Sequence, residues 1–180
     1  MIIGKEDSAD KRIILVDEDD NVLGYGEKME VHKRGQLHRC FSVMVVNSEG
    51  KVLLQKRAQG KYHCPGLWSN TCCSHPYPQE DIKAAAKRRL REEMGFDCEL
   101  EKIGVFHYKA EFDNGLTENE IDHLFKGKYD GKIAPDPAEV GDIKWIDIEA
   151  LKKDIEENPN DYTVWLKIIM ERFWQQLSVN

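Results

Sequence analysis

Apolar and polar residues alternate in short runs along the first third of the chain, and this alternation predicts β-strands. Such runs are typical of hairpins when acidic or glycine-containing turns separate them. Two hairpins are expected here, the first around an acidic turn and the second around an Asn-Ser-Glu-Gly turn. Their strands cover residues 12–16 with 21–25, and residues 40–46 with 51–55.

A helical period replaces the alternation in residues 77–94. Apolar side chains recur there at every fourth position, as in Ile82, Ala86 and Leu90, and Gly95 follows the segment. Side chains four positions apart share one face of an α-helix, and glycine favours the left-handed conformation that ends one. We therefore expect an amphipathic helix that stops at Gly95.

The second half of the chain predicts a longer hairpin over residues 103–112 and 116–125. The intervening Asp-Asn-Gly suits a three-residue loop with glycine in the left-handed region. This register pairs Tyr108 with Glu120, which places a phenol opposite a carboxylate. A two-residue loop would shift the register by one residue and remove that contact.

One further strand and two helices complete the pattern. They are expected at residues 143–146, 148–155 and 161–177. Strands that are interrupted and followed by helices, with no repeat or linker between them, indicate one α+β domain over residues 1–180. The expected architecture is an α/β/α sandwich around a mixed sheet.

Composition and charge narrow the possible partners. The 180 residues are 41% hydrophobic, enough for one substantial core, and the net charge is −7. An acidic chain is not expected to bind nucleic acid or anionic membranes broadly, so an anionic ligand needs a local cluster of Lys and Arg. We expect a monomer or weak dimer that acts on a small molecule.

The cysteines and the first ten residues indicate a cytoplasmic protein. Residues 1–10 lack the apolar core of a signal peptide, and no run is long enough to span a membrane. Five cysteines at irregular spacing argue against a disulfide framework, so free thiols are expected.

Thiol, imidazole and carboxylate groups gather in two motifs. Cys72-Cys73-Ser74-His75-Pro76 precedes the predicted helix, and Glu118-Asn119-Glu120 lies in the long hairpin. The first motif alone is compatible with a structural zinc or a strained vicinal disulfide. In the second, both glutamates share a strand face and need either a cation or solvent. A solvated outer face is the simplest reading of that pair in isolation.

Residues 74–96 resemble the Nudix box, G-x5-E-x7-R-E-U-x-E-E-x-G-U with U apolar. The matching residues are Glu80, Arg88, Leu90, Glu92, Glu93, Gly95 and Phe96. Ser74 replaces the first glycine, and Arg89 replaces a glutamate. Box carboxylates hold Mg²⁺ in the hydrolases, and an arginine among them removes a ligand. The resemblance thus implies a Nudix-like fold. Arg89 either pairs with Glu93 one turn on or grips a phosphate.

Three segments resemble the type I isopentenyl diphosphate isomerase family. They are residues 36–42, 68–76 and 117–120, which read QLHRCFS, WSNTCCSHP and TENE. The resemblance implies one divalent metal, Mn²⁺, Zn²⁺ or Mg²⁺, held by three histidines and two glutamates. The implied ligands are His32, His38, His75, Glu118 and Glu120.

The same resemblance assigns the remaining site residues. Cys73 and Glu120 match the catalytic thiol and carboxylate. Because an aromatic face can stabilise positive charge without acting as a nucleophile, Trp165 is the candidate that would stabilise a carbocation, with Tyr108 hydrogen-bonded to Glu120. Without the resemblance, Cys73 and Trp165 would be read as buried core residues. The residues implied at the diphosphate are Lys28, Arg57, Lys61, Ser74 and Arg89, with Mg²⁺ joining it to Glu93.

The implied reaction is the interconversion of isopentenyl and dimethylallyl diphosphate, a step of isoprenoid biosynthesis. One group protonates the alkene, a tertiary carbocation forms, and another group removes a proton. Two alternatives stay open from the residues alone: a Nudix pyrophosphohydrolase, and a non-catalytic protein that binds a diphosphate or a metal.

Overall fold

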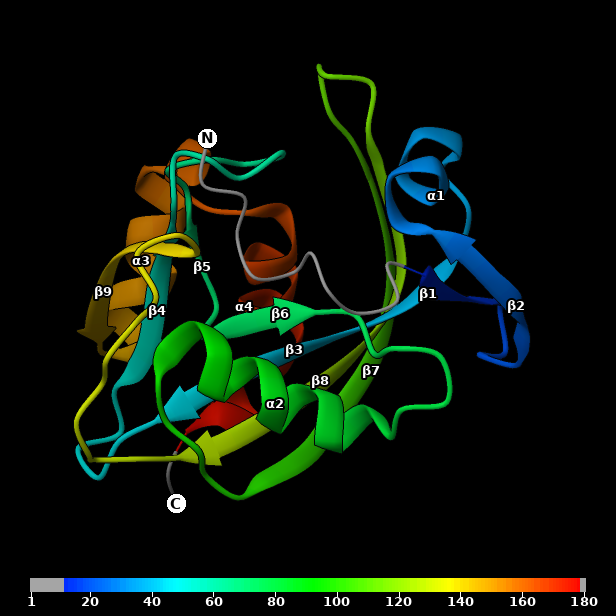
Figure 1. The fold of residues 1–180 in the computed structure, drawn as a ribbon. Helices are drawn as coiled ribbons and strands as arrows, with labels where there is room; N and C mark the ends of the chain where they lie inside the picture. The colour runs from blue at the N-terminus through cyan, green and yellow to red at the C-terminus, as the bar shows by residue number, and fades with distance from the viewer. Residues whose placement is uncertain (1–11, 179–180) are drawn as a thin grey trace.

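The computed structural model describes residues 12–178, in which four α-helices surround a single curved, mixed sheet (Figure 1). The strands are β1 (Arg12–Val16), β2 (Val22–Glu27), β3 (His38–Val46), β4 (Val52–Arg57), β5 (Trp68–Ser69), β6 (Cys72–Ser74), β7 (Leu100–Glu111), β8 (Thr117–Lys128) and β9 (Val140–Ile146). The helices are α1 (Lys28–Arg34), α2 (Ile82–Met94), α3 (Ile148–Glu157) and α4 (Val164–Leu177), and a 3₁₀ turn at Pro159–Asp161 precedes α4.

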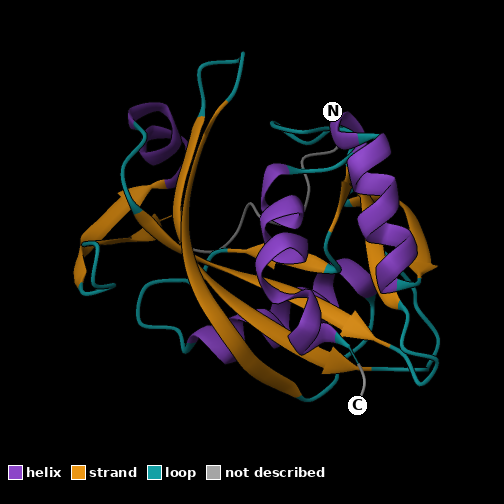
Figure 2. Ribbon diagram, turned by 180° about the vertical axis from the view of Figure 1, so that it is seen from behind, coloured by secondary structure: helices purple, strands orange, loops and turns teal. Residues whose placement is uncertain are grey.

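The central strand β3 explains the layering, because its neighbouring residues face opposite cores. Val43 and Val45 belong to a buried cluster with Leu90 of α2, whereas Met44 belongs to a second cluster with Ile169 of α4. A strand with both faces buried reads as a continuous apolar run. α4 lies behind the sheet in Figure 1 and in front of it in Figure 2, on the face opposite α2, so the predicted α/β/α sandwich is confirmed.

Pairing of the strands confirms the three predicted hairpins. β1 pairs with β2, β3 with β4, and β7 with β8, all antiparallel. The register of β7 and β8 places Tyr108 opposite Glu120, as the three-residue loop requires. β8 also runs parallel to β3, with His38 opposite Glu120. This parallel pair joins the two halves of the chain.

Two predicted helices begin later than expected, and one further helix was not expected. The amphipathic helix begins at Ile82 and not at residue 77, because the Asp81 side chain accepts a hydrogen bond from the Ala84 N–H at 2.9 Å and caps it. α4 begins at Val164, since the 3₁₀ turn occupies the residues before it. α1 was not predicted at all; its 7 residues form about two turns, and Val31 is buried.

No helix within residues 12–178 is long and apolar enough to cross a membrane. Residues 1–10, on which the expectation of a missing signal peptide rests, lie outside the described part of the chain.

Gly95 ends α2 in the left-handed region, with φ of 75°, and a Cβ at this position would lie 2.3 Å from the Ala134 carbonyl oxygen. We expect Gly95→Ala to lower the free energy of unfolding by about 2–5 kcal/mol, from backbone strain and overpacking together. Gly115 is the matched control, because its φ is 79° but nothing lies within 4 Å. Gly115→Ala should cost only about 1–2 kcal/mol in urea unfolding; equal losses would contradict the steric argument.

Candidate active site

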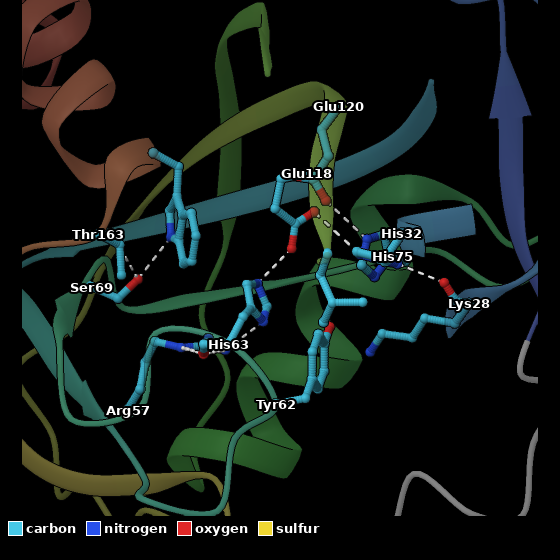
Figure 3. A network of polar contacts seen from close by, with 12 residues as sticks. Lys28, His32, Arg57, Tyr62, His63, Ser69, His75, Glu118, Glu120 and Thr163 are labelled. Carbon is cyan, nitrogen blue, oxygen red and sulfur yellow. Dashed lines mark hydrogen bonds and ion pairs between the residues drawn. The ribbon is translucent and has the colours of Figure 1, made fainter. Parts of the chain in front are cut away.

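Four elements bring the implied metal ligands to one place. Glu118 and Glu120 alternate along β8 and so share a face, and the parallel pairing sets His38 of β3 beside them. His32 comes from α1, and His75 directly follows β6. Figure 3 shows His32 and His75 pointing at the two glutamates.

The five side chains offer ligand atoms that all lie within 4.8 Å of one another, so they form a cluster that can bind a divalent metal. The predicted set of His32, His38, His75, Glu118 and Glu120 is therefore brought together without exception. Glu93, which was implied at a second ion, lies apart from them on α2.

Backbone carbonyls fix the ring tautomers of two of these histidines. His32 Nδ1 lies 2.6 Å from the Lys28 carbonyl oxygen, and His38 Nδ1 lies 2.8 Å from that of Gln36. A carbonyl only accepts, so each Nδ1 carries the hydrogen and each Nε2 keeps its lone pair. Both Nε2 atoms and Glu118 Oε2 are buried without a hydrogen-bond partner. Unpartnered lone pairs that converge in a buried place are the donor set that a cation satisfies.

Glu120 joins this cluster to the cavity beside it. Its Oε1 lies 2.9 Å from His75 Nε2 and 3.2 Å from His38 Nε2, and its Oε2 accepts a short hydrogen bond from the Tyr108 hydroxyl. Burial opposes ionisation, but the adjacent His38 and His75 rings outweigh it and lower the pKa of the Glu120 carboxyl well below its usual value. Glu120 is held as a carboxylate.

Cys73 lines the same cavity as Glu120, Tyr108 and Trp165. Burial raises the pKa of the Cys73 thiol to about 12, so the thiol keeps its proton at neutral pH. Its neighbour Cys72 faces the other way on β6 and is fully buried in the cluster under α2. The alternation of the strand therefore gives the two adjacent thiols different surroundings.

Trp165 is anchored by its indole nitrogen, which donates to Ser69 Oγ at 2.8 Å and to Asn70 Oδ1 at 3.1 Å. The Arg57 guanidinium lies 5.5 Å from the centroid of the indole ring, and the Tyr108 ring centre lies 6.4 Å away. Trp165 thus belongs both to the core and to the cavity wall.

The residues implied at the diphosphate gather at this same cavity. They are Lys28, Arg57, Lys61, Ser74 and Arg89. Arg89 donates to Glu92 at 2.8 Å and to Glu93 at 2.6 Å, which confirms the ion pair one turn apart. Lys61 pairs closely with Glu139. This concentration of cationic groups is the local cluster that an acidic protein needs to hold an anion.

Sequence reasoning missed three polar residues at the site, of which His63 and Asp122 are buried and Glu139 is half-buried. His63 lies against Glu118, and no motif marks it. Glu139 pairs with Lys61 from a distant loop. Asp122 continues the Glu-x-Glu alternation along β8, and that period was the available signal. Burial, with the Glu120 charge adding to it, raises the pKa of Asp122 to about 8, and Asp122 accepts a hydrogen bond from Ser42 Oγ at 2.7 Å.

The fold and the Nudix-box residues of α2 identify the class of protein. A NUDIX domain profile matches residues 36–166. A solved structure of the protein DR0079 from Deinococcus radiodurans matches with a TM-score of 0.75 at 18% identity, over 89% of this chain and 98% of that one. A MutT NUDIX hydrolase from Burkholderia pseudomallei matches with a TM-score of 0.62 at 20% identity, over 77% of this chain and 98% of its own. At such identities the likeness concerns the fold alone.

Sequence relatives then specify the branch. Isopentenyl-diphosphate Delta-isomerase 2 of Aromatoleum aromaticum is 49% identical over 94% of this chain and 89% of its own length. The isopentenyl-diphosphate Delta-isomerase of Burkholderia multivorans is 49% identical over 91% of this chain and 93% of its own length. Isopentenyl-diphosphate Delta-isomerase 2 of Photorhabdus laumondii is 45% identical over 93% of this chain and 99% of its own length. The chain belongs to the isopentenyl-diphosphate Delta-isomerase family.

Proposed function

We propose that this protein interconverts isopentenyl diphosphate and dimethylallyl diphosphate. The observation that carries the proposal is one cavity lined by the Cys73 thiol, the Glu120 carboxylate and the Trp165 indole ring together with the cationic cluster. The family names of the relatives support it. The substrate's diphosphate would be held by the cationic side chains and its five-carbon chain would lie between Cys73 and Glu120.

The chemistry follows from the two protonation states. An alkene is a weak base, so it needs a positioned acid on one face and a base for the carbocation that forms. Cys73 holds the proton and Glu120 is ionised, so for the isopentenyl substrate Cys73 gives its proton to the terminal carbon and Glu120 removes one from C2. The proton returns from Glu120 to Cys73 before the next turnover. Trp165 and Tyr108 shield the cation from water, and the indole face stabilises it.

A divalent metal fits the cluster of three histidines and two glutamates. Three imidazole nitrogens with two carboxylates favour Mn²⁺ or Zn²⁺ over Mg²⁺. When bound, the ion would supply positive charge beside Glu120 and hold its carboxylate in one orientation. Glu93 has a different environment, next to Arg89 and to Gln55 Nε2 at 3.0 Å. We assign it to an Mg²⁺ that arrives with the diphosphate.

One assay separates the isomerase from the alternatives. The protein is incubated with isopentenyl diphosphate, Mg²⁺ and Mn²⁺ in D₂O and followed by NMR. We expect deuterium to enter a dimethylallyl product, because the enzyme's exchangeable protons become deuterons. Release of phosphate without isomerisation would replace the proposal with a pyrophosphohydrolase, and Arg89 within the box carboxylates argues against that outcome. Binding without any reaction would identify a non-catalytic binder.

We also propose a single cytoplasmic domain that works as a monomer or weak dimer. All five cysteines are free thiols, as a reducing compartment favours.

A further inference from the structure

His63 reaches the metal-ligand cluster from the loop between β4 and β5. Its side chain is 7% exposed, and its Nε2 lies 2.5 Å from Glu118 Oε1. The ring stacks on Tyr62 with centroids 4.4 Å apart and meets the edge of Phe112 at 5.4 Å. Figure 3 shows the imidazole pointing at Glu118 from the side opposite the cluster histidines. Aromatic packing therefore fixes a ring that touches a ligand but is not one of the five.

The two oxygens of Glu118 have different partners. Oε2 faces the cluster, 3.2 Å from His32 Nε2 and 3.8 Å from His38 Nε2. Oε1 is taken by His63. A carboxylate with one oxygen held from outside has little freedom to rotate, and its other oxygen stays aimed inward. Glu120 shows the same arrangement, with Tyr108 on its outer oxygen.

Arg57 fixes the direction of the hydrogen bond. Its guanidinium Nη2 lies 3.4 Å from His63 Nδ1, and a guanidinium only donates. Nδ1 is therefore the acceptor, and Nε2 carries the hydrogen that is donated to Glu118. Arg57 Nε and Nη2 also donate to the His63 carbonyl oxygen at 3.2 Å and 3.1 Å, which holds the backbone in place.

We propose that His63 is a positioning residue, whose Nε2–H holds the outer oxygen of Glu118 so that the inner oxygen stays aimed at the metal. This inference rests on the metal site proposed above. The loop that contains His63 also carries Lys61, which is proposed to bind the diphosphate. The contacts of His63 with Arg57 and Glu118 therefore connect this loop to the metal centre.

The test measures Mn²⁺ affinity of the purified full chain, from the electron paramagnetic resonance signal of free Mn²⁺. The site in question is the one at which Glu118→Gln weakens Mn²⁺ binding. We expect His63→Ala and His63→Asn to weaken Mn²⁺ binding by about 10–100-fold, the usual effect of losing an outer hydrogen bond to a ligand. His63→Gln should stay within a few-fold of the native protein, because its amide nitrogen reaches the position of Nε2, whereas that of asparagine reaches only Nδ1.

Asn114→Ala is the matched control for the loop. Asn114 Nδ2 donates to the Tyr62 carbonyl oxygen at 2.8 Å, so its loss loosens the loop without touching Glu118. Mn²⁺ affinity should be unchanged in this variant, and urea unfolding checks that every variant is folded. If Asn114→Ala lowers Mn²⁺ affinity as much as His63→Ala does, the loop as a whole anchors the site and the inference is overturned. Native Mn²⁺ affinity in both His63→Ala and His63→Asn would overturn it as well. If the native protein binds no Mn²⁺ at this cluster, the proposed metal site itself fails.

Discussion

Cys73→Ala is expected to lower kcat by about 10²–10⁴-fold, the range typical of losing a positioned acid or base. The Cys73 thiol lines the same cavity as Glu120, and its raised pKa keeps it protonated at neutral pH. Alanine keeps the backbone of β6 and removes only the proton donor, so the loss should appear in kcat more than in KM. Initial rates of dimethylallyl diphosphate formation measure the effect.

Cys72→Ala is the control for this change, because it removes an adjacent thiol from the same strand. Cys72 is fully buried under α2, among residues such as Phe41 and Leu90, and does not line the cavity. We expect its kcat to stay near the native value while stability falls by about 1 kcal/mol, as for a small core truncation. If Cys73→Ala keeps near-native turnover, or if Cys72→Ala loses as much, the assignment of the catalytic thiol is wrong.

Glu120→Gln should abolish turnover, since Glu120 is placed to accept the proton and also belongs to the metal cluster. A neutral amide is not a base, and it is a weaker ligand than a carboxylate. We expect both a fall in kcat of at least about 10³-fold and weaker Mn²⁺ binding. Turnover and free Mn²⁺ are measured on the same preparation.

Glu118→Gln separates these two jobs of Glu120. Glu118 shares the metal cluster, but its outer oxygen faces His63 and not Tyr108. At Mn²⁺ concentrations that saturate both variants, Glu118→Gln should recover part of its activity while Glu120→Gln stays inactive. Equal recovery in the two would mean that Glu120 serves only as a ligand.

Periodicity predicted the fold well where the pattern was long. The hairpin of β7 and β8 was found with its register, because Asp-Asn-Gly fixes the turn and the turn fixes every pair along the strands. α1 was missed because Lys28–Arg34 is short and carries only two buried residues, Val31 and His32. A helix of about two turns has too few positions to display a period.

The site was predictable only in part, for a different reason. The family resemblance pointed to all five residues of the metal cluster, including His75 and the Glu-x-Glu pair. His63 carries no local pattern, and it reaches Glu118 only because the loop folds across the end of the hairpin. Glu139 meets Lys61 in the same way. Contacts between loops that are far apart in the chain form only on folding. The spacing of residues in a single sequence therefore cannot predict them.

The parallel pairing of β3 with β8 also has a consequence for folding kinetics. Ser42 and Asp122, which hydrogen-bond across this pair, are 80 positions apart in the chain. Closing so long a loop is entropically costly and must precede the contacts that reward it, which slows folding. His38 and Glu120 meet only through the same pairing. A chain with its hairpins formed but its two halves still apart would therefore have no metal cluster, and an ion that binds there would select the fully folded protein from every earlier intermediate.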